Sequence, residues 1–364
     1  MEIDKSSNFN LDIIRCLAAY MVLFCHLGQY CGLSVTDEMR KGVQLFFILS
    51  GYLIFNSLNH TSSLGQYYRK RFLRIVPVYW LVLVINYVMG GGGGWFVFID
   101  REPIGFLFSN EGPLGIKYLR YFFFLHMFIP SENYGYWNNA YAVWTMSSFA
   151  FFYLVAPFLY KLINRFSKAL FLLCILMVLR PFVQKLMLSY LFTVMEKSEQ
   201  LIWFVNNTPV NTIYCVIFGC TAYLALKEKR LSLYGIYLTF IAIMGKMQWY
   251  TYEIVVCMLF IIILCCPLEV KNIFIQKCIR LLSNASFSLY LIHPVTLQYM
   301  NFFMLKVLKD SRLCNILRLI VLLSSAIIIS INFWKFIEYP LENWLFSRFI
   351  KQGDKNDIGH KLCK

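Results

Sequence analysis

Long apolar stretches, separated by short polar and basic connections, run through most of the chain. One of them, from Glu253 to Pro267, holds no charged residue after its first position. Such stretches are too long and too frequent for the core helices of a soluble protein, whereas about 20 apolar residues let a helix cross a bilayer. The pattern predicts an all-α fold, a polytopic transmembrane helical bundle with about ten spans. We expect the spans at residues 11–30, 40–58, 75–90, 144–160, 169–185, 209–226, 231–247, 251–268, 285–304 and 314–337.

The composition also indicates a membrane protein. Of the 364 residues, 59% are hydrophobic and 15% are charged, which is too little charge to cover a soluble protein of this length. The net charge of +15 would suit a nucleic-acid-binding protein, but the basic residues lie mainly between the apolar stretches. We therefore interpret the charge as a sign of topology and expect no nucleic-acid partner. The 12 cysteines lack metal-binding spacing, and we expect them to pack as small hydrophobic residues.

The basic clusters predict the orientation of the chain in the bilayer. Successive connections between spans lie on opposite sides of the membrane. The tight clusters of Lys and Arg all fall on one of these sides, at residues 69–74, 161–168, 227–230 and 271–280. The positive-inside rule places that side in the cytoplasm. We expect both termini there, and the protein in the cell membrane, which in a bacterium is the inner membrane. Asp12 and Arg15 interrupt the first apolar stretch, so we interpret it as a retained span and not as a cleaved signal peptide.

One long connection and a short tail complete the predicted organisation. The connection from Gly90 to about Tyr141 lies outside in this topology, and loops of this length are usually functional. Its hydrophobic piece, Tyr118–Pro130, is too short to span and should lie in the interface or re-enter the membrane. We expect a transmembrane domain over residues 1–346 and a short basic cytoplasmic tail over residues 347–364.

Two ionisable residues lie inside the first expected span. Arg15 and His26 are eleven residues apart, so on a helix they share a face and are separated by about 16 Å along the axis. Ionisable residues within spans are functional candidates because burying them in lipid is costly. Two structural alternatives stay open: Arg15 could anchor the interface or pair with Asp12, and His26 could be a buried histidine bonded to a neighbouring helix.

A second basic candidate lies at the inner edge of the third span. Arg71 and Arg74 are three residues apart and share a helical face. The simple interpretation is an anchor that follows the positive-inside rule. The alternative is a clamp for the phosphates of a cytosolic ligand, which the planar fork of arginine suits well.

Two further positions have both structural and functional interpretations. Ser50 and Gly51 form a small pair that would let helices approach closely. His293 precedes Pro294 and could bond backbone groups that the proline leaves free. No group of His, Cys or carboxylate side chains has convincing metal spacing, so we expect no metal.

Taken in order, these segments resemble the acyltransferase 3 family, integral membrane O-acyltransferases that modify glycans and related surface molecules. The opening signature is Leu11-Asp12-x-x-Arg15 followed by His26. The other segments that agree with family motifs are Gly42–Tyr52, Arg71–Pro77, Ser286–His293 and Phe336–Pro340. The resemblance covers almost the whole chain.

One position departs from the family pattern. Many members carry a glutamate where this chain has Phe149, within Trp144–Pro157. Either the chain is similar to a branch without that acid, which includes enterobacterial common antigen O-acetyltransferases, or its chemistry is impaired. We prefer the first interpretation because Arg15, His26 and the Arg71/Arg74 pair are all present.

The resemblance implies transfer of an acyl group from an acyl-CoA, most simply acetyl-CoA, to a hydroxyl of a glycan or lipid-linked sugar. It implies that His26 and Arg15 are catalytic and that Arg71 and Arg74 bind the donor. Residues that could support the site are Ser50, Tyr153 and His293. Imidazole titrates near neutrality, so His26 suits a general base, although an acyl-histidine intermediate is an alternative. The long aromatic loop is our candidate for acceptor recognition.

Two rival functions stay open at this point. The chain could transport or flip a lipid-linked glycan or lipid, with Arg15 and His26 along the substrate path. It could also be a degenerate family member that acts as a scaffold, which the phenylalanine at position 149 allows.

Overall fold

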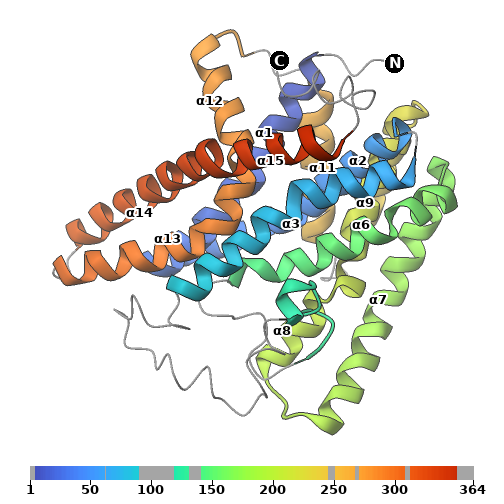
Figure 1. Ribbon diagram of the computed structural model, residues 1–364. Coiled ribbons are helices and arrows are strands. Elements are labelled where there is room, and N and C mark those ends of the chain that lie inside the picture. The colour runs from blue at the N-terminus through green and yellow to red at the C-terminus, as the bar shows by residue number, and fades with distance from the viewer. Residues whose placement is uncertain are drawn as a thin grey trace.

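The computed structural model describes residues 5–61, 63–89, 119–130, 141–244, 251–266, 270–307 and 312–350, and helices make up all the regular structure in these ranges (Figure 1). The helices of the first half are α1 (Lys5–Cys31), α2 (Gly42–Asn59), α3 (Leu64–Met89), α6 (Trp144–Leu162) and α7 (Phe166–Val194). Those of the second half are α8 (Glu199–Asn207), α9 (Pro209–Lys227), α10 (Leu231–Met244), α11 (Thr251–Cys265), α12 (Ile273–Asn284), α13 (Ser286–Val307), α14 (Arg312–Phe333) and α15 (Tyr339–Phe349). Short 3₁₀ turns cover Ser34–Lys41 and Tyr141–Val143, and a π-helical turn, Trp334–Glu338, joins α14 to α15.

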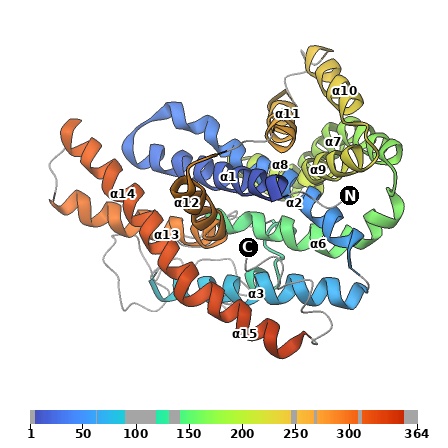
Figure 2. The ribbon, with the colours of Figure 1, turned by 90° about the horizontal axis from the view of Figure 1, so that it is seen from above.

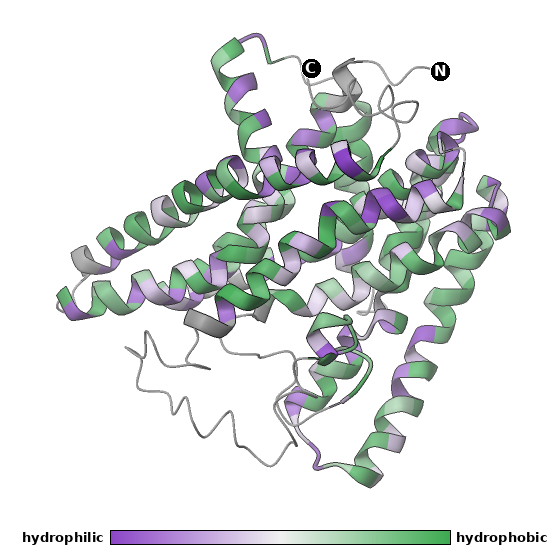
Figure 3. Ribbon diagram, viewed as in Figure 1, coloured by the Kyte–Doolittle hydropathy of each residue, from purple (hydrophilic) through white to green (hydrophobic). Residues whose placement is uncertain are grey.

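The helical fold class is as predicted, whereas the number of spans is not confirmed. Within the described ranges, six helical segments are long and apolar enough to cross a membrane: Phe9–Cys31, Glu38–Asn59, Trp144–Leu162, Phe166–Val194, Pro209–Lys227 and Asn315–Phe349. Helices also lie at the other four expected positions, namely α3, α10, α11 and α13, but α10 and α11 are short. The first half of α3 is strongly basic, and α13 carries several polar side chains, which lowers the hydropathy of both (Figure 3).

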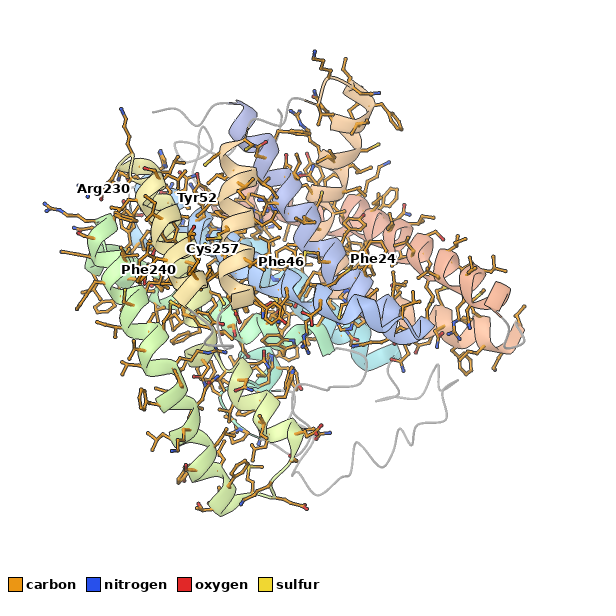
Figure 4. The ribbon with its side chains drawn as sticks, turned by 180° about the vertical axis from the view of Figure 1, so that it is seen from behind. Phe24, Phe46, Tyr52, Arg230, Phe240 and Cys257 are labelled. Atoms are coloured by element: carbon orange, nitrogen blue, oxygen red, sulfur yellow. The ribbon has the colours of Figure 1, made fainter. Side chains whose placement is uncertain are left out.

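The helices pack as a bundle around α1 and α2. In Figure 2, α10 and α11 lie at one side and the paired α13 and α14 at the other, with α1 and α2 between them, and α3 and α6 run side by side along a further side. Aromatic side chains join the layers. Tyr52 of α2, labelled in Figure 4, has its ring centroid 5.7 Å from those of Tyr223 in α9 and Phe260 in α11.

The tightest contact in the bundle joins α2 to α9 through two glycines. A Cβ atom built on Gly51 would lie 2.0 Å from the carbonyl oxygen of Val216, and one built on Gly219 would lie 1.8 Å from that of Ile48. Each helix therefore brings a glycine against the other's backbone, the kind of approach that small residues permit in membranes. Gly51 thus has the packing role that the sequence suggested for the Ser50-Gly51 pair.

The described part of the long connection, residues 119–130, packs into the bundle. Tyr79 and Trp80 of α3 donate hydrogen bonds to the carbonyl oxygens of Tyr121 and Phe122, at 2.9 and 3.0 Å. Met127 is fully buried. The segment thus lies against α3, and the rest of the predicted 90–141 loop, apart from Tyr141, falls outside the described residues.

The last described helix overlaps the start of the expected tail. Helix α15 continues to Phe349, so the first residues of the predicted 347–364 tail are helical. Residues 351–364 of that tail lie outside the described part of the chain.

Candidate active site

Helices α1 and α13 bring two histidines into contact. The rings of His26 and His293 stack with their centroids 5.3 Å apart and their planes 29° apart. His26 is half-buried and His293 is 1% exposed. Two motifs that lie far apart in the sequence therefore meet, and we call this contact the histidine pair.

Hydrogen bonds orient both rings. Nδ1 of His26 lies 3.2 Å from Oε1 of Gln29, one turn further along α1. Nδ1 of His293 donates to the carbonyl oxygen of Leu289 at 2.9 Å, in the turn before Pro294. With Nδ1 of His26 donating to the amide oxygen, its Nε2 carries the lone pair that a general base needs.

Arg15 lies on the same helix, where it belongs to a small polar network. Its guanidinium is 3.4 Å from a carboxylate oxygen of Asp12 and donates to the hydroxyl of Ser283 at 3.3 Å. Ser283, at the end of α12, donates to the same Asp12 oxygen at 2.7 Å. The predicted Asp12 pair exists, but Arg15 also faces a second helix, as His26 does.

Three arginines converge on Tyr153 of α6. The guanidinium of Arg71 lies over the Tyr153 ring at 5.3 Å and over the Tyr67 ring at 5.7 Å. Arg15 and Arg74 lie close enough for their charges to repel each other, and both are within electrostatic range of Tyr153. We call Arg15, Arg71 and Arg74 around Tyr153 the arginine cluster.

Carboxylates from the end of the chain balance part of this charge. Arg74 forms a 3.9 Å ion pair with Glu342 of α15, although its side chain is 52% exposed. Glu338 is buried in the π-helical turn and accepts a hydrogen bond from the hydroxyl of Ser288 in α13. π-Helical turns recur at functional sites because they re-aim side chains. Here the turn directs a carboxylate toward α13.

Other residues singled out in the sequence lie beside these two centres. Phe149 packs between aromatic rings, 5.0 Å from Phe47 and 6.4 Å from Tyr153 between centroids. Ser50 is half-buried directly before the Gly51 contact, and none of the hydrogen bonds described above involves it. The structure therefore gathers Arg15, Arg71, Arg74 and Tyr153 at one centre and His26 with His293 at the other.

Sequence reasoning missed several partners of these residues. Gln29 could have been found from its spacing of one turn from His26. Ser283 and Glu338 reach the site from distant helices, and no local spacing points to them. No group of three or more His, Cys, Asp or Glu side chains that could hold a metal occurs within the described residues.

Both centres belong to a helical bundle in which six of the described helical segments are long and apolar enough to cross a bilayer. Residues 8–335 match the acyltransferase domain family model. The chain therefore belongs to the acyltransferase 3 family, which confirms the predicted family and supports the interpretation as an acyl-transferring enzyme.

Two curated relatives are similar over part of the chain. Nodulation protein 10 of Rhizobium leguminosarum bv. viciae is 27% identical over 170 residues, which cover 44% of this chain and 46% of that protein. Peptidoglycan O-acetyltransferase OatA of Listeria monocytogenes is 26% identical over 154 residues, which cover 41% of this chain and 23% of that protein. Each alignment thus spans less than half of the relative. No solved structure matches the chain.

Proposed function

We propose that the protein transfers an acyl group, most simply acetyl, from an acyl-CoA to a hydroxyl of a cell-surface or lipid-linked glycan. The observation that carries this proposal is the convergence of Arg15, Arg71 and Arg74 on Tyr153. Asp12 and Glu342 pair with Arg15 and Arg74, but the side chain of Arg74 is 52% exposed, so it is accessible to an anionic ligand. Coenzyme A supplies several phosphates, and arginine binds phosphates by two parallel hydrogen bonds.

The arginine cluster is the proposed donor end. Arg71 and Arg74 lie in the basic first half of α3, where an anionic cytosolic ligand would dock in the topology we expect. The guanidinium carbon of Arg71 lies over two tyrosine rings, 5.3 and 5.7 Å from their centres, and guanidinium N–H groups bind oxyanions well. Arg15 would hold the phosphate nearest the bilayer or orient the pantetheine arm.

The histidine pair is the proposed reaction centre, about 16 Å along α1 from Arg15. Nε2 of His26 would take the proton from the acceptor hydroxyl while its oxygen attacks the thioester carbonyl. The C–S bond then breaks, and coenzyme A leaves as a thiolate that takes up the proton. Stacking on the buried His293 fixes the His26 ring, and Gln29 fixes its tautomer.

The positions of the two centres also support a division between donor and acceptor. Arg15 lies closer to the cytoplasmic start of α1, and His26 lies toward its other end, so an acceptor could enter from the outer side. This division rests on the expected topology, in which the protein lies in the cell membrane with both termini in the cytoplasm. The neighbouring aromatic segment 119–130 would then lie on the acceptor side.

The test is donor binding by the purified protein in detergent. We expect acetyl-CoA to raise the midpoint of thermal unfolding of the wild type, and the Arg71→Ala/Arg74→Ala variant to bind it at least about tenfold more weakly, since each lost charged contact removes more than 1 kcal/mol. Dephospho-CoA should bind more weakly than acetyl-CoA to the wild type.

A matched control separates phosphate binding from loss of surface charge. Arg230, labelled in Figure 4, is 58% exposed and lies 3.8 Å from Glu228, a geometry close to that of Arg74 and Glu342. Arg230→Ala should leave donor binding unchanged. Equal losses in both variants, or no shift of the wild type at saturating acetyl-CoA, would contradict the proposed donor site. Full transferase activity of His26→Ala would contradict the proposed base.

A further inference from the structure

One buried carboxylate, that of Glu338, has no part in the proposed reaction steps. Glu338 belongs to Phe336–Pro340, the last segment that agrees with a family motif, and its side chain is 5% exposed. It lies within the candidate span Asn315–Phe349, where a buried charge is costly unless it is paired and hydrogen-bonded. The side chains that stabilise this carboxylate therefore indicate its role.

A π-helical turn, Trp334–Glu338, brings Glu338 against α13. The backbone N–H of Tyr339 donates to the carbonyl oxygen of Trp334, five residues back, which is the hydrogen bond of a π-helix. Pro340 follows directly and has no N–H to restore the regular α-helical pattern at once. The wider turn changes the direction of Glu338 relative to α14, and its carboxylate meets α13, which runs beside α14 (Figures 1 and 2).

The partner of Glu338 on α13 is a buried hydroxyl. Ser288 donates its hydroxyl to a carboxylate oxygen of Glu338. Ser288 lies in the first turn of α13, where backbone N–H groups without partners in the helix favour a negative charge. His293 follows five residues later, about 140° around the same helix. This contact on one side of α13 therefore helps to set the rotation at which His293, on another side, faces His26.

The same carboxylate also lies near the arginine cluster. Glu338 is within electrostatic range of Arg74, which pairs with Glu342 at 3.9 Å. The phosphates of a donor that binds Arg74 would be repelled by both carboxylates. One side chain thus contacts the helix that carries half of the histidine pair and opposes the positive charge at the donor end.

We propose that Glu338 is a positioning residue for acyl transfer, which fixes α13 and its half of the histidine pair relative to the arginine cluster. This role presupposes the proposed function, in which one centre binds the donor and the other activates the acceptor. The carboxylate favours turnover through Ser288 and weakens donor binding through its charge near Arg74. A residue needed only for folding would not separate these two effects.

The experiment measures kcat and the KM for acetyl-CoA separately, as labelled acetyl transferred to the glycan fraction of native membranes in which each variant replaces the wild type. The maximal rate is divided by the amount of protein present. Ser288→Ala should lower kcat about tenfold with the KM unchanged, since it removes a hydrogen bond but no charge. Glu338→Gln should lower both constants, kcat through a weaker hydrogen bond and the KM about threefold through the lost negative charge.

Two controls separate the hydrogen bond from the charge. Thr296→Val removes a buried hydroxyl of α13 that donates to the carbonyl oxygen of Ile292 in the same helix, and it should change neither constant. Glu342→Gln removes the other carboxylate near Arg74 and should lower the KM, with less effect on kcat than Glu338→Gln.

The double variant Ser288→Ala/Glu338→Gln tests whether the two side chains act through one contact. Its kcat should equal that of Ser288→Ala alone. Losses that multiply, a wild-type kcat in both single variants, or a raised KM in Glu338→Gln would overturn the role of Glu338. A wild type that transfers no acetyl from acetyl-CoA would refute the proposed function and this role with it, whereas an active wild type without the split between KM and kcat would refute the role alone.

Discussion

The α2–α9 crossing gives the sharpest stability prediction. In Gly219→Ala, the new methyl group would lie 1.8 Å from the carbonyl oxygen of Ile48. Carbon and oxygen atoms approach no closer than about 3.3 Å, so the two helices must separate by about 1.5 Å at this point. The obstructing atom belongs to the backbone of α2 and cannot rotate away.

The expected cost follows from two opposing effects. Overpacking a well-packed core costs up to about 3 kcal/mol, and a backbone clash belongs at the upper end of that range. Alanine is favoured over glycine in a helix by about 1 kcal/mol, which offsets part of the cost. We therefore expect Gly219→Ala to destabilise the protein by about 2 kcal/mol, and Gly51→Ala, with 2.0 Å to the carbonyl oxygen of Val216, to do about the same.

The assay is thermal or denaturant unfolding of purified variants in one detergent. Gly235 in α10 is the matched control, because a Cβ added there meets no atom within 4 Å. Gly235→Ala should be neutral or slightly stabilising. The reasoning would be refuted if Gly219→Ala unfolded at the same midpoint as Gly235→Ala, because the helices would then have room for the methyl group.

Three further predictions concern the site and its surroundings. Gln29→Leu removes the oxygen that holds the proton on Nδ1 of His26, so kcat should fall about tenfold and its pH profile should change, with the KM for the donor unchanged. A change in KM alone would speak against this role. Phe149→Glu should lower the unfolding midpoint, more than Phe149→Leu does, by burying a carboxylate between aromatic rings, and equal midpoints of the two variants would contradict this. Burial lowers the pKa of His126, in segment 119–130, from 6.5 to about 4. The unfolded chain therefore binds a proton before the folded chain does, so stability should fall by about 3 kcal/mol as the pH drops from 6.5 to about 4, and His126→Gln should flatten this profile.

Local periodicity explains what could be predicted from the sequence. Arg15 and His26 share a helix, so their spacing alone places both side chains on one face of it. In the structure, Arg15 on this face contacts α12 and His26 contacts α13, the next helix in the chain. The closeness of Arg71 to Tyr153 could not be predicted in this way, because it depends on how α3 crosses α6. Family motifs indicated the candidate segments, without indicating which of them are in contact.

The hydropathy signal is weakest in the helices that supply polar residues to the candidate site. Helix α3 is basic in its first half because it supplies the arginines, and α13 is polar because it supplies Ser288 and His293. The same side chains that mark function weaken the apolar signal by which spans are counted. The position of segment 119–130 does not follow from hydropathy either, because its burial depends on hydrogen bonds from Tyr79 and Trp80.

The parallel course of α1 and the α12–α13 segment restricts insertions and deletions in the first helix. Arg15 meets Ser283, and His26 meets His293 ten residues later on the neighbouring segment. One residue inserted between Arg15 and His26 would rotate His26 by about 100° and move it about 1.5 Å along the axis. The imidazole would then leave its stacking partner while the arginine kept its own. The ten-residue interval between Arg15 and His26 is thus a fixed length of the protein, and in this region homologous chains should differ by substitution and not by length.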